Sequence, residues 1–76
     1  MLIRIRLMFE TLELMVLWSD TLMHLKRKVE DMAQIPVASQ RWYTQGRELE
    51  DDDLTMEELG VSAAEALICD DTRRNA

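Results

Sequence analysis

The stretch "SDTLMHLKRKVEDMAQIP", residues 19–36, decides the fold of this 76-residue chain. Its first three residues favour the N-terminal cap of a helix. The four apolar residues that follow recur at helical spacing: Leu22, Leu25, Val29 and Met32. Pro36 cannot extend a helix and favours an extended conformation at the residue before it. The stretch therefore predicts one amphipathic helix of about three turns.

One charged residue, Lys26, lies within the apolar arc of this helix, between Leu22 and Val29 on a helical wheel. A lysine on the core side of a helix is rarely buried without a partner of opposite charge. We therefore expect a carboxylate close to Lys26.

Upstream of the helix, two runs alternate between apolar and other side chains. The runs MLIRIRL and TLELMVL begin at residues 1 and 11, and each shows the period of two that is typical of a strand with one buried face. Antiparallel pairing would set Arg4 opposite Glu13 and Leu2 opposite Met15. The two runs predict a hairpin. Its tip, LMFE, lacks the Gly, Asn or Asp of tight turns, so the geometry of the tip stays open.

Downstream of the helix, a second pair of strands is expected. Residues 40–44 are β-prone, a Gln-Gly turn follows, and residues 47–50 return as a short strand. Alternation then points Trp42 and Leu49 toward the helix, as core residues, and Tyr43 away from it.

The last third of the chain predicts a helical turn and a final strand. Residues 55–58, TMEE, match a capping box, and Gly60 can end that turn. Residues 66–69, ALIC, read as a strand. We expect residues 1–72 to form one domain, followed by a flexible tail at residues 73–76.

Composition restricts the classes of function. A chain this short has room for one core, and its net charge of −6 argues against nucleic-acid binding. Cys69 is the single cysteine, so no internal disulfide can form. No charge-free apolar run is long enough for a signal peptide or a membrane helix. We expect a cytoplasmic or nuclear protein that binds neither nucleic acid nor membranes.

The order strand, strand, helix, strand, strand, short helix, strand resembles the ubiquitin family over residues 1–71. The residues in ubiquitin-like register are SDT at 19–21, Lys26, Lys28, Ile35-Pro36, Gln40-Arg41, Gly46, LED at 49–51 and Leu67. The resemblance implies an α+β fold of the β-grasp type: a mixed four- to five-stranded sheet packed on one main helix, with a second short helical turn. It also implies that Lys26 is a structural residue, largely buried and paired with Asp51.

Two departures from the family pattern bear on function and stability. Ubiquitin-like modifiers join their substrates through a C-terminal Gly-Gly, whereas this chain has glycine only at Gly46 and Gly60 and ends RRNA. Conjugation is not expected for the chain as given. The glycine that ends the family's main helix is replaced by Gln34, whose left-handed conformation would cost on the order of 1 kcal/mol.

Catalytic and metal sites are not expected. His24 falls off the apolar face of the helix, and Cys69 lies in a strand, so neither forms a constellation with an acid or base. The acidic run EDDD, residues 50–53, lacks the spacing and glycine of a calcium-binding loop. We predict that the protein is not an enzyme and has no cofactor.

The resemblance places a protein-binding face on the outward side of the sheet. The residues that align with it are Arg6, Arg41, Tyr43 and Arg47. Tyr43 replaces the central isoleucine of the surface by which ubiquitin meets its receptors, and an aromatic ring framed by arginines suits an interface. Asp70 replaces an apolar residue of that surface and narrows it.

A second interface is suggested by apolar residues on the outer side of the first hairpin: Leu2, Met15, Leu17 and, next to them, Trp18. So much exposed apolar area suggests packing against another protein or the rest of a longer chain. The alternative is a differently twisted hairpin that buries these side chains.

These observations favour a non-covalent interaction module, a ubiquitin-like domain belonging to a larger protein. We expect a monomer that docks on ubiquitin receptors, the proteasome or related partners. The alternative is a ubiquitin-like modifier whose processed Gly-Gly end is absent from this chain.

Overall fold

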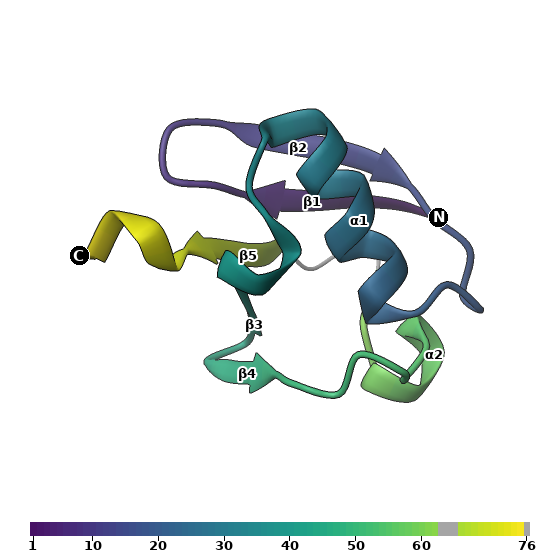
Figure 1. Ribbon diagram of the computed structural model, residues 1–76. Helices are drawn as coiled ribbons and strands as arrows, with labels where there is room; N and C mark the ends of the chain where they lie inside the picture. The colour runs from purple at the N-terminus through teal and green to yellow at the C-terminus, as the bar shows by residue number, and fades with distance from the viewer. Residues whose placement is uncertain (63–65, 76) are drawn as a thin grey trace.

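The computed structural model describes residues 1–62 and 66–75, and in it the long helix α1 crosses one face of a five-stranded sheet (Figure 1). The strands are β1 (Leu2–Arg6), β2 (Thr11–Met15), β3 (Gln40–Thr44), β4 (Arg47–Leu49) and β5 (Ala66–Asp71). The helices are α1 (Leu22–Ala33), α2 (Met56–Leu59) and the 3-10 turns η1 (Val37–Ser39) and η2 (Thr72–Asn75).

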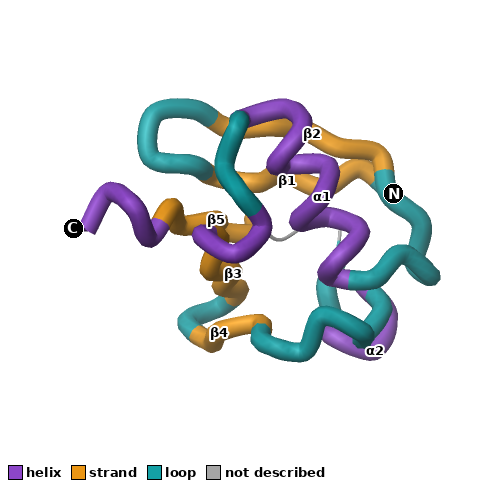
Figure 2. Tube along the Cα trace, in the orientation of Figure 1, coloured by secondary structure: helices purple, strands orange, loops and turns teal. Residues whose placement is uncertain are grey.

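The sheet is mixed, as predicted, and has five strands in the order β2-β1-β5-β3-β4. The neighbours β1 and β5 are parallel, and the other three pairs are antiparallel. The β1–β2 register sets Arg4 opposite Glu13 and Leu2 opposite Met15, which confirms the predicted hairpin. The tip of this hairpin and η2 lie at one end of the molecule, and the N-terminus lies at the other (Figure 2).

The helix α1 begins where its cap predicts, because the Thr21 hydroxyl accepts the His24 N–H at 3.3 Å. Leu22, Leu25 and Val29 are fully buried, but the prediction for Met32 is wrong, since its side chain is 52% exposed. At 100° per residue, Met32 lies about 80° from Leu22 around the helix, whereas Ala33 lies only about 20° away. Ala33 therefore packs against the core in its place.

The left-handed C-cap at Gln34 is confirmed, with φ 61° and ψ 31°. Its N–H donates to the Glu30 carbonyl at 3.0 Å, so the helix end is satisfied although the residue carries a Cβ. The same conformation recurs in the β3–β4 turn, where both Gln45 and Gly46 have positive φ. Two such central residues are characteristic of a type I′ hairpin turn.

The alternation predicted for β3 is confirmed. Trp42 is fully buried and pairs with Leu49 across β4, whereas Tyr43 lies on the opposite face. The Trp42 indole N–H is satisfied inside the core, because it donates to Gln40 Oε1 at 2.9 Å. Gln40 Nε2 in turn donates to the carbonyls of Lys26 and Ile35, each at 2.9 Å. A single buried amide thus ties β3 to the middle of α1 and to the segment that follows the helix.

Lys26 is largely buried, as the resemblance implies, but its partner is Asp52 rather than Asp51. Lys26 Nζ lies 2.6 Å from Asp52 Oδ1, and the two side chains are 11% and 35% exposed. The Asp52 carbonyl also accepts the Met23 N–H at 3.1 Å, which holds this residue beside the first turn of α1. Asp51 is exposed and accepts the Asp53 N–H instead. The expected partner is therefore corrected by one position.

The helix α2 begins with the predicted capping box. Thr55 Oγ1 accepts the Glu58 N–H at 3.2 Å, and the Glu58 carboxylate accepts the Thr55 N–H at 3.0 Å. Gly60 ends the helix with φ 72°. Part of the segment predicted to be a flexible tail lies in η2, where the Arg73 guanidinium donates to both Asp71 oxygens at 2.9 and 3.0 Å.

Candidate functional site

The sheet face that points away from α1 has an apolar centre made by two side chains from neighbouring strands. Ile68 in β5 lies directly between Arg6 in β1 and Tyr43 in β3. In the adjacent row, Arg41 is paired with Asp70. We call this set the outer patch: Arg6, Arg41, Tyr43, Ile68 and Asp70.

Ile68 was not among the expected binding residues, yet its side chain is 45% exposed at the centre of the outer patch. The signal was present in the sequence, because Leu67 and Cys69 are apolar neighbours that alternation sends inward. Both of those side chains are buried, so Ile68 must face outward. It restores apolar area that Asp70 removes.

Arg41 does not extend freely into solvent but is held against β4. Its Nη2 and Nε donate to the two carboxylate oxygens of Glu48 at 2.8 and 3.1 Å, a bidentate ion pair. This hydrogen bonding raises the pKa of Arg41 and lowers that of Glu48. On the β3 side of the outer patch the positive charge of Arg41 is therefore partly neutralised. On the β1 side Arg6 supplies a positive charge.

Arg47 is placed differently from the expectation that it frames the outward face. It pairs with Thr44, whose side chain is buried, so alternation turns it toward the α1 side of the sheet edge. Its Nη2 donates to the Leu59 carbonyl at 2.6 Å, beside the end of α2. Arg47 thus anchors α2 to β4, and we leave it out of the outer patch.

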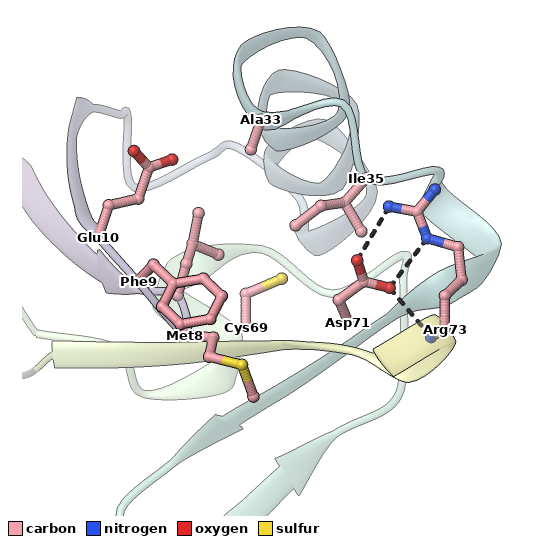
Figure 3. Close-up of a pocket in the computed structure, with 9 residues that line it drawn as sticks. Met8, Phe9, Glu10, Ala33, Ile35, Cys69, Asp71 and Arg73 are labelled. Atoms are coloured by element: carbon pink, nitrogen blue, oxygen red, sulfur yellow. Dashed lines mark hydrogen bonds and ion pairs between the residues drawn. The ribbon is translucent and has the colours of Figure 1, made fainter. Parts of the chain in front are cut away.

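Two hollows flank the tip of the β1–β2 hairpin. One, of about 250 Å³, adjoins the outer patch and is lined by Arg6, Leu7, Met8, Ile68, Cys69 and Asp70. The other, of about 140 Å³, lies between the hairpin tip, the end of α1 and the end of β5 (Figure 3). Met8 borders both hollows, and Phe9, which is 78% exposed, borders the second.

The second hollow contains no activated nucleophile. Cys69 is buried, and this desolvation, reinforced by the charges of Asp70 and Asp71, raises the pKa of its thiol to about 12. A neutral thiol is a poor nucleophile. The carboxylate of Asp71 is paired with Arg73, as Figure 3 shows, and that hydrogen bonding raises the pKa of Arg73.

The second interface that the sequence suggests is exposed as expected. Leu2, Met15, Leu17 and Trp18 are between 44% and 68% exposed, so the alternative of a hairpin that buries them is excluded. We call these four residues the N-terminal patch.

Among residues 1–62 and 66–75, no group of three or more His, Cys, Asp or Glu side chains could hold a metal ion. His24 is exposed. None of the helices described is long and apolar enough to cross a membrane.

Comparison with known proteins agrees with the fold. The model of the ubiquitin family matches residues 3–69. The chain belongs to the ubiquitin family. Among solved structures, it is 30% identical to the ubiquitin of Caldiarchaeum subterraneum, with 93% of this chain and 91% of that one covered and a TM-score of 0.83.

A ubiquitin-like domain of an Arabidopsis thaliana protein shares the fold at 20% identity, with a TM-score of 0.89 and coverage of 99% and 80%. No curated protein matches the chain significantly. The family and the β-grasp fold are thus established, and the function of this member depends on what its surfaces bind.

Proposed function

We propose that this ubiquitin-like domain is a non-covalent docking module, without enzymatic activity, that binds ubiquitin-receptor domains or proteasomal subunits through the outer patch. The observation that carries the proposal is the pair Ile68 and Tyr43, an aliphatic and an aromatic residue directly opposite each other on β5 and β3, on the face away from the core. Such an apolar pair, surrounded by a rim of charged residues, is typical of an interface centre.

The surroundings of the pair support binding of a protein segment rather than a small molecule. The hollow beside Ile68 is open to solvent, and its lining includes the charged residues Arg6 and Asp70. An apolar side chain of a partner helix would fill it, and acidic or amide groups of the same helix would meet Arg6. We propose that the domain acts as a monomer in the cytoplasm or nucleus, as part of a larger protein.

The test is a titration of the isotope-labelled chain with a ubiquitin-interacting helix and with a proteasomal receptor fragment, followed by two-dimensional NMR. We expect the largest shifts at Arg6, Arg41, Tyr43 and Ile68. The His24→Ala variant, altered on the exposed face of α1, is the matched control and should bind as the wild type does. Shifts confined to α1 or α2, or no shifts with either ligand, would contradict the proposal.

The second candidate is a ubiquitin-like modifier, which is favoured by family membership and by the 30% identity to the ubiquitin of Caldiarchaeum subterraneum. A modifier presents an extended tail to its enzymes, whereas here the chain after β5 enters η2 and Arg73 bonds Asp71 and the Gln34 carbonyl. The two candidates are distinguished by incubating the natural full-length protein with ubiquitin-type activating and conjugating enzymes, because the chain ending RRNA would give no thioester under either candidate. Docking alone predicts no thioester with the natural protein, and a thioester would favour the modifier.

A further inference from the structure

We propose that the N-terminal patch is a second, independent docking site, whose partner is an amphipathic segment with basic residues beside its apolar stripe. Its residues are neighbours across the β1–β2 pair or along the chain. Leu2 lies directly opposite Met15 across the β1–β2 pair, and Leu17 follows Met15 by two residues on the same side. Trp18 continues the surface at the first corner of the turn from Leu17 to Asp20.

The patch is held rigid by contacts on both sides. Asp20 Oδ2 accepts the Leu17 N–H at 2.9 Å, and the Trp18 carbonyl accepts the Glu57 N–H at 3.1 Å, which ties the turn to α2. On the other side, Val16 exchanges two hydrogen bonds with Met1. A partner therefore meets a preformed surface, and little conformational entropy is lost from this chain on binding.

Charge decides what kind of partner the patch fits. Glu13 precedes Met15 by two residues on the same strand face, the Asp20 carboxylate accepts the Leu17 N–H, and the Glu57 N–H donates to the Trp18 carbonyl. Arg4 lies opposite Glu13 and offsets its charge, and the Met1 ammonium donates to the Val16 carbonyl at 2.6 Å. Asp20 and Glu57, beside the Leu17–Trp18 end of the patch, form no ion pair among the described residues, so this end favours lysine or arginine on the partner.

The same charges disfavour a second copy of this chain as the occupant. A symmetric dimer through the patch would bring the acids of one copy against those of the other. The net charge of −6 adds a long-range repulsion between copies. A basic amphipathic helix instead places its apolar stripe over Met15 and Leu17, packs against the Trp18 ring and directs its cations at Asp20 and Glu57.

The N-terminal patch is distinct from the outer patch, although both lie on the face away from α1. Leu2 and Arg6 are four residues apart along β1, a separation of roughly 13 Å at the rise of a strand. Arg4 and Glu13 stand between the two surfaces. Substitutions in one patch should leave binding at the other unchanged.

The test uses two synthetic helical peptides with the same leucine stripe, one flanked by lysines and the other by glutamates, titrated into the isotope-labelled 76-residue chain. We expect the lysine peptide to shift Leu2, Met15, Leu17 and the Trp18 indole, with a dissociation constant of about 100 μM that weakens as salt is added. The glutamate peptide should bind at least about tenfold more weakly.

Variants assign the contacts. Trp18→Ala should weaken binding of the lysine peptide about tenfold or more, and Glu57→Gln about twofold to threefold, while Tyr43→Ala binds it as the wild type does. Because Trp18 is half exposed, its loss should leave the thermal midpoint nearly unchanged; Met15→Ser serves if Trp18→Ala does not fold. The proposal would be overturned if the two peptides bind equally, or if the lysine peptide shifts Tyr43 and Ile68 or shifts neither patch. A concentration-dependent dimer of the chain would also overturn it.

Discussion

The contact between Lys26 and Asp52 gives a sharp prediction about stability. Removing the lysine side chain would leave Asp52 Oδ1 buried, with no other hydrogen-bond partner among the described residues. Breaking a fully buried ion pair costs about 3 to 5 kcal/mol, and an exposed pair is worth about 1 kcal/mol or less. Lys26 is nearly buried but Asp52 is a third exposed, so we expect Lys26→Ala to destabilise the domain by about 2 to 3 kcal/mol.

The neighbouring aspartate is the matched control. Asp52→Ala should cost about 2 kcal/mol, because the lysine ammonium can partly reach water along its flexible stem. Asp51→Ala should cost less than about 0.5 kcal/mol, because Asp51 is exposed and its carboxylate contacts the loop backbone. Combining Lys26→Ala with Asp52→Ala should reveal a coupling of about 1.5 kcal/mol.

Urea unfolding followed by tryptophan fluorescence measures these free energies. In a domain of this size, 2 kcal/mol corresponds to a fall of about 8 to 16 °C in the thermal midpoint, so a thermal scan gives an independent value. If Asp51→Ala is as destabilising as Asp52→Ala, or if Lys26 couples to Asp51, the assignment of the ion pair is refuted.

Three further predictions concern the core and the helix end. Trp42→Ala should destabilise the domain by about 3 to 5 kcal/mol in urea unfolding, since it removes a fully buried ring and leaves Gln40 Oε1 with only the weak Cys69 thiol as a donor. A loss below about 1 kcal/mol would contradict the packing. Gln34→Gly should raise the free energy of unfolding by about 0.5 to 1 kcal/mol in the same assay, because glycine adopts the left-handed C-cap conformation without strain. A decrease would mean that contacts of the Gln34 side chain stabilise the native state by more than the strain of its left-handed backbone destabilises it. Cys69 should resist alkylation at about pH 8 in the native state and react in urea, and rapid alkylation of the native protein would refute the burial. Because the folded pKa of Cys69 is raised, the free energy of unfolding should fall from about pH 9 upward, as the thiol ionises in the unfolded chain. The Cys69→Ala variant should not show this loss.

Much of the fold could be predicted from local patterns in the sequence. Alternation in the first hairpin predicts the register that pairs Leu2 with Met15, because a shift by one residue would expose Ile3 and Ile5. The capping residues Thr21 and Thr55 mark where both helices begin, since their hydroxyls satisfy N–H groups within the next turn.

The remaining features depend on contacts between distant segments. The Lys26 partner was misplaced by one residue because the carbonyl that anchors Asp52 bonds to Met23, a contact across the fold. Arg47 sits at a sheet edge, where its guanidinium reaches the Leu59 carbonyl instead of the outward face. The exposed tip residues Met8 and Phe9 follow no periodic pattern, so the hollows beside them could not be expected from sequence.

The central claim, docking through the outer patch, is tested most directly by calorimetry. The measurement compares the affinities of the Tyr43→Ala variant and the wild type for a ubiquitin-interacting helix. Tyr43 lies outside the core, so the variant should unfold within a few degrees of the wild type. Its affinity should fall by about 2 kcal/mol, or roughly thirtyfold, because the ring forms half of the apolar centre of the outer patch. An affinity equal to that of the wild type, with the fold intact, would contradict docking through this face.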